Sequence, residues 1–353
     1  MRVLVVANFG ERYFGERFYI VERKLANGFT RNGHLSYLFS DRDVARTGTI
    51  FRSSRAGRKV ANARFLEVVR NLEPDLIVVA HSSPITTETL AESKRAGVGA
   101  RIAQVCVDPL FRGVNVEFLA DRAKVVDATF VTTAGAALAR FKSATNVSSY
   151  IPNPVDSSIE TLRGFERRDQ SFDVLFAANA AGDRPGDARR TTPRLIAESG
   201  GATINYHGFG GRPGVYGSAY FHALANSRMA LNINSDRAER AATRAPEDDL
   251  YLYNSDRIAQ LMGCGLLTLS YRVNRLMELF EPNEEMIFAD TPEEMRDAVL
   301  RFKRDDSRRR EIAEAGWLKS HERFNERVVA RYIEEVAFRR PLSQPYLWPT
   351  KLW

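Results

Sequence analysis

The 353-residue sequence contains no apolar run near the roughly 18 residues that a membrane-spanning helix needs. Its first residues have the pattern of an apolar strand and lack that of a cleavable signal. Cysteine is also scarce, and the two that occur, Cys106 and Cys264, both lie in apolar segments. These absences argue against a membrane-spanning or disulfide-built protein, so we expect a cytoplasmic one.

Metal-binding and dinucleotide-binding motifs are missing as well. No Cys or His residues stand at the spacing of a zinc site, so we expect no structural zinc site. The glycines of residues 10–15 lack the G-x-G-x-x-G spacing, which disfavours an NAD enzyme. The net charge of +7 would suit nucleic acid, but no helix-turn-helix, zinc-finger or RNA-binding aromatic pattern accompanies it, so we expect no such partner.

Positive charge is concentrated in residues 41–64, whose net charge is +5. The basic residues of this segment are Arg42, Arg46, Arg52, Arg55, Arg58, Lys59 and Arg64. One interpretation is a solvated loop. The other is a surface for an anionic partner, such as lipid headgroups, which would give a peripheral contact at the inner face of the membrane.

The first half of the chain alternates strand-like and helical patterns. A continuous apolar run such as residues 76–80 is typical of a parallel sheet covered on both faces. The alternation predicts a doubly wound parallel sheet. Strands are expected at residues 2–7, 35–39, 76–80, 101–107, 128–131 and 149–151, and helices at residues 18–32, 60–71 and 87–96.

Two prolines in residues 152–156 interrupt this alternation, and a second series follows. Its strands are expected at residues 172–177, 204–208, 229–233, 266–269 and 285–288, and two late helices at residues 307–315 and 322–338. We therefore predict an α/β protein with two Rossmann-like domains facing a cleft, at residues 1–160 and 161–325. Residues 326–353 end in an aromatic and basic tail, which we expect to pack back on the first domain; a membrane interface is the alternative.

Residues 253–269 form the most informative segment. Apolar residues recur there at helical spacing, and Gly263 and Gly265 end the expected helix before a buried strand. A helix N-terminus with Arg257 in its first turn suits an anion, although many such connections bind nothing. The residues where N-caps occur are Asn254, Ser255 and Asp256.

Three segments carry a family resemblance. Residues 151–156 (IPNPVD) resemble a linker turn, residues 253–269 resemble an "R-x-x-E-x-x-x-C-G" helix with its strand, and residues 279–316 resemble an "lFepgeE…dpeEl…ia~aG" ending. All three are similar to the C-terminal domain of GT-B glycosyltransferases of the group 1 type, including CgeB-like proteins. In the first half only the topology and the Gly33-His34 turn resemble that family. The resemblance implies transfer of a sugar from a nucleotide-diphosphate sugar, UDP or GDP, without a metal.

One departure from the family pattern affects the mechanism. Retaining relatives carry two glutamates separated by seven residues, and here Gln260 and Tyr253 stand at those places. The expectation therefore leans toward inversion. An inactive relative that binds nucleotide or sugar as a scaffold is the alternative, and a nucleotide-sugar epimerase is a third interpretation, for which no acidic and histidine pair can be assigned.

The resemblance places the donor site in the second domain. Negative charge develops on the leaving diphosphate, so cations must stabilise it if no metal does. Arg257 is the first candidate, followed by Arg184 and then Arg275, with surface salt bridges as their alternative role. The other candidate donor-binding residues are Asn179, His207, Gly208, Tyr253, Asn254, Ser255, Asp256 and Glu278.

Inversion also needs a base that takes the proton of the acceptor hydroxyl. Asp108 and His81 each follow a buried strand of the first domain, and Glu16 lies in the loop after its first strand. The carboxyl ends of parallel strands are where ligands bind in such sheets, although Asp108 before a proline also suits a plain turn. The expected acceptor is a saccharide or a lipid-linked saccharide.

Overall fold

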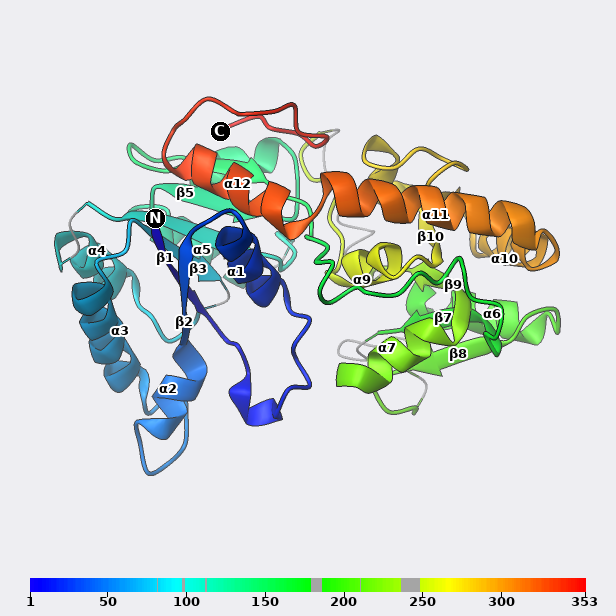
Figure 1. Ribbon diagram of the computed structural model, residues 1–353, viewed down its shortest axis with the longest axis horizontal. Coiled ribbons are helices and arrows are strands. Elements are labelled where there is room, and N and C mark those ends of the chain that lie inside the picture. Colours follow the sequence, from blue (N-terminus) through cyan, green and yellow to red (C-terminus); the bar gives the residue numbers. More distant parts are fainter. Residues whose placement is uncertain (81, 97–98, 112, 179–185, 210, 236–247) are drawn as a thin grey trace. The chain divides into compact units, whose positions relative to one another are not determined.

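A computed structural model describes the chain apart from residues 81, 97–98, 112, 179–185, 210 and 236–247. The chain forms two compact units (Figure 1). Unit 1 comprises Met1–Pro154, Asp248–Leu250 and Asn325–Trp353, and unit 2 comprises Val155–Glu247 and Tyr251–Phe324. Each unit contains its own parallel sheet with helices, which confirms the predicted α/β class.

The sheet of unit 1 has six strands in the order β2-β1-β3-β4-β5-β6, and all its pairings are parallel. Because β2 and β3 lie on opposite sides of β1, the chain changes direction across the sheet at β1 and β3, which is where doubly wound sheets bind ligands. The strands are β1 (Arg2–Ala7), β2 (Leu35–Ser40), β3 (Leu76–Ala80), β4 (Arg101–Cys106), β5 (Ala128–Val131) and β6 (Val147–Tyr150).

Helices cover both faces of this sheet. Leu4 and Ile77 share one buried cluster with Phe65, a residue of α3, so that helix covers one face. On the other face α12 contacts β4, β5 and α1. The helices of unit 1 are α1 (Val21–Arg31), α2 (Asp41–Thr47), α3 (Arg58–Leu72), α4 (Thr87–Ala96), α5 (Gly113–Arg122) and α12 (Glu326–Ala337), with short 3-10 turns η1 (Glu11–Tyr13) and η2 (Ala136–Phe141).

The contact between α1 and α12 joins segments about 300 residues apart in the sequence. It is so close that a Cβ atom on Gly28 would lie 2.1 Å from the carbonyl oxygen of Glu326. Tyr332 of α12 is fully buried, and its hydroxyl lies 2.6 Å from Ser149 Oγ of β6. The ring of Trp348 packs edge-on against Tyr332 at 5.4 Å, so the C-terminal segment is anchored on unit 1 through this buried ring.

The sheet of unit 2 has five strands in the order β11-β10-β9-β7-β8, again all parallel. Its change of direction lies between β7 and β9. The strands are β7 (Phe172–Ala177), β8 (Ile204–His207), β9 (Ser227–Asn232), β10 (Leu267–Tyr271) and β11 (Ile287–Ala289). The helices are α6 (Ala188–Glu198), α7 (Gly217–Ala225), α9 (Arg257–Gly263), α10 (Pro292–Arg304) and α11 (Asp306–Arg323), with 3-10 turns η3 (Arg272–Asn274) and η4 (Leu276–Glu278).

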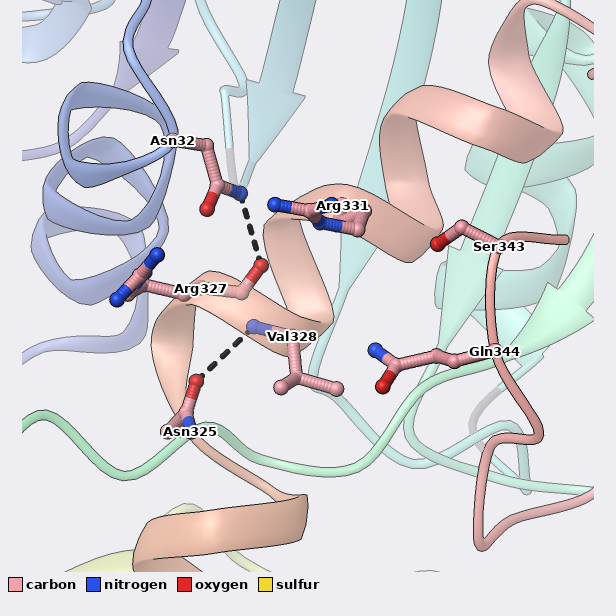
Figure 2. Close-up of a pocket in the computed structure, with 7 residues that line it drawn as sticks. All are labelled: Asn32, Asn325, Arg327, Val328, Arg331, Ser343 and Gln344. Atoms are coloured by element: carbon pink, nitrogen blue, oxygen red, sulfur yellow. Dashed lines mark hydrogen bonds between the residues drawn. The ribbon is translucent and has the colours of Figure 1, made fainter.

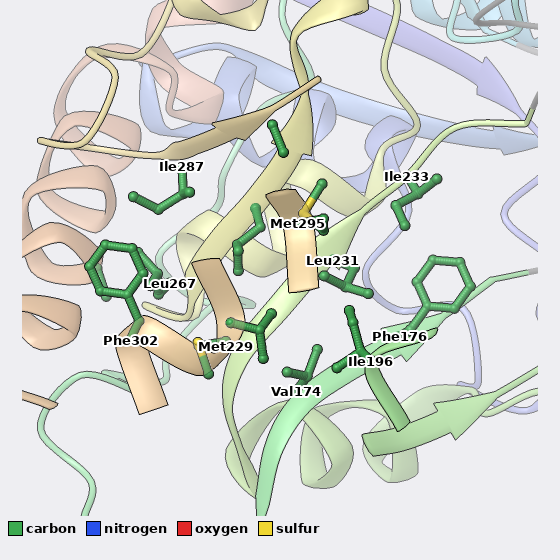
Figure 3. Close-up of a cluster of buried hydrophobic side chains, with 14 of the residues drawn as sticks. Val174, Phe176, Ile196, Met229, Leu231, Ile233, Leu267, Ile287, Met295 and Phe302 are labelled. Carbon is green, nitrogen blue, oxygen red and sulfur yellow. The ribbon is translucent and has the colours of Figure 1, made fainter. Parts of the chain in front are cut away.

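Apolar side chains from strands and helices form one buried cluster in unit 2 (Figure 3). Phe176 and Leu231 come from β7 and β9, Ile196 comes from α6, and Met295 and Phe302 come from α10. Burial of such side chains is the main favourable term in folding. It holds the two strands at the change of direction in fixed positions.

Several expected boundaries are wrong by a few residues. The helix expected from residue 18 begins at Val21, the last strand of the first sheet is β6 at Val147–Tyr150, and α12 begins at Glu326 because α11 continues to Arg323. Residues 41–64 are not one solvated loop, since they hold α2 and the start of α3. Asp41 and Asp43 occupy the first turn of α2, where negative charge stabilises a helix.

We expect the substitution Gly28→Ala to destabilise unit 1 by about 1–3 kcal/mol, the cost of overpacking. The contact is with a backbone oxygen, which cannot rotate away, so the loss exceeds the roughly 1 kcal/mol that alanine contributes to helix propensity. Urea denaturation followed by circular dichroism measures the change. The matched control is Gly113→Ala at the start of α5, where no atom lies within 4 Å of an added Cβ; equal midpoints for the two variants would contradict the prediction.

Candidate functional site

The guanidinium of Arg257 joins the ends of the two strands that flank the change of direction in unit 2. It donates hydrogen bonds to the carbonyl oxygen of Ala177 at 3.2 Å, where β7 ends, and to that of Ile233 at 2.7 Å, just after β9. The side-chain oxygen of Asn232 is a third partner at 3.4 Å. In open parallel sheets this position is the ligand-binding crevice. The first residue of α9 therefore lies at the position expected for a donor site.

Arg257 remains a cation in these surroundings. Burial lowers the pKa of its guanidinium, and the nearby Tyr220 and Asp256 oppose that effect. Because an arginine begins from a pKa above 12, the group stays charged at neutral pH. Its carbon CZ lies 5.7 Å from the centre of the Phe176 ring. The carboxyl edge of this sheet thus carries a fixed positive charge.

The polar residues before α9 have different roles from one another. Ser255 Oγ accepts a hydrogen bond from the backbone N–H of Arg257 at 3.4 Å, whereas Asp256 stands at the N-cap without a side-chain bond to the helix. Asn254 is buried, and its Oδ1 accepts from Asn232 Nδ2 at 2.8 Å. The sequence therefore located the start of α9, but it assigned to Asn254 and Asp256 a capping role that Ser255 has.

The C-terminal end of α9 follows the prediction. Gly265 has φ +71°, and its N–H donates to the carbonyl of Met262, while Leu266 N–H donates to that of Leu261. This pair of bonds is the Schellman motif. Gln260 is 1% exposed, so the place where retaining relatives have a glutamate holds a buried neutral amide.

A second group of candidates lies where β8 ends. The ring nitrogen Nε2 of His207 is 2.8 Å from Asn205 Oδ1, and burial together with the Arg212 charge lowers the pKa of His207, so the imidazole is neutral at pH 7. Gly208 has φ +76°, and a Cβ there would lie 1.8 Å from the carbonyl oxygen of Ala178. Glycine is thus required at Gly208 by the adjoining backbone.

Arg275 and Glu278 pair with each other. Arg275 Nε donates a hydrogen bond to Glu278 Oε1, and the guanidinium lies 4.1 Å from the centre of the Tyr251 ring. Both side chains are about one-third exposed. This arrangement is the salt bridge given above as the alternative role of Arg275. The backbone carbonyl of Tyr253 accepts from Asn234 Nδ2 at 3.1 Å, and Asn179 and Arg184 lie outside the described residues.

The sequence interpretation missed Arg189, a buried cation in the first turn of α6. Its Nε and a terminal nitrogen bind the carboxylate of Asp187 at 3.0 and 2.9 Å, and the guanidinium lies 5.1 Å from the centre of the Phe209 ring. The charge of Arg189 contributes to the lowered pKa of Arg257, so the two cations are electrostatic neighbours. An Asp at an N-cap two residues before an Arg was the available signal.

Unit 1 has a cavity of about 240 Å³ next to β3 and β4. Asp108, which follows β4, lines it together with Arg42 and Arg122. Val114 and Phe118 of α5 add apolar surface and are 78% and 41% exposed. A cavity with apolar walls and a few convergent polar groups is the usual form of a small-molecule site.

Two groups at this cavity have shifted pKa values. Burial lowers the pKa of Arg122 to about 10, and its guanidinium donates to the carbonyl oxygens of Ser82 and Ile85 beyond β3. Burial raises the pKa of the Cys106 thiol to about 12, so the thiol stays protonated and is a poor nucleophile. Arg122 is held by its hydrogen bonds and the Cys106 thiol is inert, so neither can act as a base. Asp108 is therefore the candidate base that lines this cavity.

The other two candidate bases are placed differently. Glu16 is exposed in the loop between β1 and α1 and does not line the cavity. His81 lies outside the described residues. Among the residues that the structure covers, no group of three or more His, Cys, Asp or Glu side chains could hold a metal ion. No helix in the same part of the chain is long and apolar enough to cross a membrane.

Comparisons with known proteins give a family domain and a common fold. Residues 189–335 match the family model described as glycosyl transferase-like. No curated protein matches the sequence.

Three solved structures illustrate the similarity of fold. Sucrose-phosphate synthase from Thermosynechococcus elongatus aligns with a TM-score of 0.55 at 11% identity over 96% of this chain and 98% of its own. HepE from Anabaena in complex with UDP gives 0.53 at 14% identity over 96% and 100%. An α-glucosyltransferase in complex with UDP and DNA gives 0.60 at 10% identity over 96% and 99%. The TM-scores establish a common fold of two Rossmann-like domains, and at identities this low the similarity shows the fold alone.

Proposed function

We propose that the chain is a glycosyltransferase of the GT-B fold that uses a UDP- or GDP-sugar as donor, with its glycosyl transferase-like domain at residues 189–335. The acceptor in this proposal is a saccharide or lipid-linked saccharide, as in the biosynthesis of bacterial envelope polysaccharides. The observation that carries the proposal is the buried cation Arg257 at the carboxyl edge of the second sheet. The neighbouring Arg189 is already paired with Asp187. Two of the similar structures contain UDP, which supports a nucleotide donor.

The chemistry fits those charges. Transfer breaks the bond between the anomeric carbon and the diphosphate oxygen, so negative charge grows on the phosphates. Cations held in place before the reaction stabilise that charge without reorganisation. In the proposal Arg257 has this role without a metal. Arg184 and Asn179, which follow β7 in the sequence, are further candidates for contacts with the donor sugar nucleotide. The neutral His207 uses its Nε2–H on Asn205 Oδ1, so its Nδ1 accepts a hydrogen bond from a hydroxyl of the sugar nucleotide.

The proposal leans toward inversion. The acceptor oxygen attacks the anomeric carbon while a base takes its proton, and the nucleotide diphosphate leaves with the bonding electrons. Asp108 is the first choice as base because it lines the cavity of unit 1. The buried amide of Gln260 cannot supply the negative charge that a carboxylate would have at that place.

Nucleotide binding is the first test of the proposal. We expect millimolar UDP or GDP to raise the melting temperature, because a ligand of the native state stabilises it. Arg257→Gln should raise the Kd for the nucleotide about tenfold or more, the value of a charge-assisted hydrogen bond. The matched control is Arg194→Gln, an exposed arginine of α6 paired with Glu198.

Loss of Arg257 also leaves strand-end carbonyls without their donor, so circular dichroism must first show that the variant folds. Arg257→Lys serves as a second variant, since it keeps the charge but not the forked geometry. If no nucleotide in a broad panel binds the native protein, the proposed donor is wrong.

Activity distinguishes the three candidate bases. The variants to compare are Asp108→Asn, His81→Gln and Glu16→Gln. We expect the variant that removes the base, which by this proposal is Asp108→Asn, to lower kcat by about 10²–10⁴-fold and to leave the Kd for the nucleotide unchanged. The product's anomeric configuration, read by NMR, should be opposite to that of the donor. A retained configuration would exclude direct displacement. Binding without either transfer or donor hydrolysis would favour the scaffold alternative.

We propose that the basic segment contacts an anionic membrane. Ile50 and Phe51 are 91% and 77% exposed in the loop between α2 and α3, next to Arg52. Adjacent exposed apolar side chains among basic residues suit insertion between anionic headgroups. No carboxylate follows α2 until Glu67, so the positive charge in this loop is uncompensated along the sequence.

Flotation with phosphatidylglycerol vesicles tests the contact. We expect Ile50→Ser with Phe51→Ser, and separately Arg52→Gln with Arg55→Gln, to reduce the floated fraction several-fold. Leu318→Ser, which removes a 48% exposed leucine from α11, is the control and should float like the native protein. Flotation that is insensitive to both pairs would remove the membrane from the proposal.

A further inference from the structure

A second pocket of unit 1, of about 350 Å³, lies among the C-terminal end of α1, the first turns of α12 and the tail (Figure 2). Its lining is polar apart from Val328. Figure 2 shows the tail residues Ser343 and Gln344 across from α12, with Asn32 on the α1 side. A volume of this size suits a small organic molecule better than a lone ion.

Two arginines of α12, Arg327 and Arg331, line this pocket. Residues four apart lie on the same side of a helix, so the two side chains leave α12 from neighbouring positions. Both side chains are exposed, and within the part of the chain that the structure describes neither has a carboxylate within 4 Å. The pocket therefore carries two positive charges that no described acidic group neutralises.

The acidic residues of α12 are already engaged elsewhere. Glu326 pairs with Arg31. Glu334 pairs with His34 at 2.9 Å and with Arg340. Glu335 accepts a hydrogen bond from the Tyr346 hydroxyl at 2.7 Å. Since these three are the only acidic residues of the helix, α12 itself offers no counter-ion to the arginine pair.

The pocket is also lined by uncharged polar side chains. The side-chain nitrogen of Asn32 donates to the backbone carbonyl of Arg327 at 2.9 Å, which fixes the orientation of the amide. Ser343 and Gln344 add a hydroxyl and an amide from the tail.

We propose that this pocket binds a phosphate monoester that also carries hydroxyl groups, such as a sugar phosphate. A phosphate accepts paired hydrogen bonds from guanidinium groups, which suits Arg327 and Arg331, and the hydroxyl groups of the ligand bind Ser343 and Gln344. Because the ligand would contact both α12 and the tail, its binding would stabilise the C-terminal segment against unit 1. The site is separate from the donor site proposed above and does not depend on it.

Isothermal titration calorimetry of the full chain tests this site, with glucose 6-phosphate, glucose and inorganic phosphate as probes and UDP present in excess. We expect glucose 6-phosphate to bind more tightly than either other probe. Arg327→Gln and Arg331→Gln should each raise its Kd about tenfold. The matched control is Arg70→Gln, an exposed arginine at the end of α3, which should change nothing.

Changes in the NMR signals of the arginine Nε–H groups identify the arginines that bind glucose 6-phosphate. The test of this pocket therefore gives a result even if UDP does not bind and the proposed donor is wrong. Vesicles containing phosphatidic acid form the second arm. The protein could bind these vesicles and fail to bind glucose 6-phosphate, and Arg331→Gln could abolish the vesicle binding. That result would keep the phosphate site but assign it to a lipid headgroup. Binding that is equal in the native protein and in the Arg327→Gln, Arg331→Gln double variant would overturn the proposal.

Discussion

The ends of β7 and β9 present carbonyl groups that need hydrogen-bond donors, and Arg257 supplies them from the first residue of α9. An unpaired buried carbonyl costs about 1–3 kcal/mol, so this contact is both structural and electrostatic. It joins α9 to the strands, and it keeps a cation at the carboxyl edge of the sheet, where open parallel sheets bind ligands. The positive charge of Arg189 lies close enough to affect the Arg257 pKa. Architecture and proposed donor chemistry therefore depend on the same guanidinium group.

Unit 1 depends on a different constraint, close approach of backbones. Gly28 lets α1 lie against the start of α12, and Tyr332 then reaches Ser149. Because α12 is held there, its exposed arginines face the pocket under the tail. The acidic residues of the helix serve its attachment to α1 and to the tail, through Arg31, His34 and Tyr346. The acidic residues of α12 thus hold the helix in place, and its two exposed arginines line the pocket.

Much of the fold was predictable from sequence because strands buried on both faces read as continuous apolar runs, as β3 does. Short amphiphilic helices such as α5 and α7 were missed, since few residues carry their periodicity. The position of Arg257 was predictable from polar residues before a helical pattern, but its partners were not, because Ala177 lies 80 residues earlier in the sequence. Arg189 was missed because Phe209 and Arg257 meet it only in the folded state.

The placement of α12 and the tail in unit 1 has a consequence for synthesis. Domains generally fold as units while the chain emerges from the ribosome. Here residues 1–154 emerge first but lack the helix that covers β4 and β5, which arrives only after all of unit 2. The first unit to begin is therefore the last to be completed. Until residues 325–353 emerge, the part of β4 and β5 that α12 covers lacks its helix, and a ribosome that stalls within unit 2 would leave that part open to chaperones and proteases.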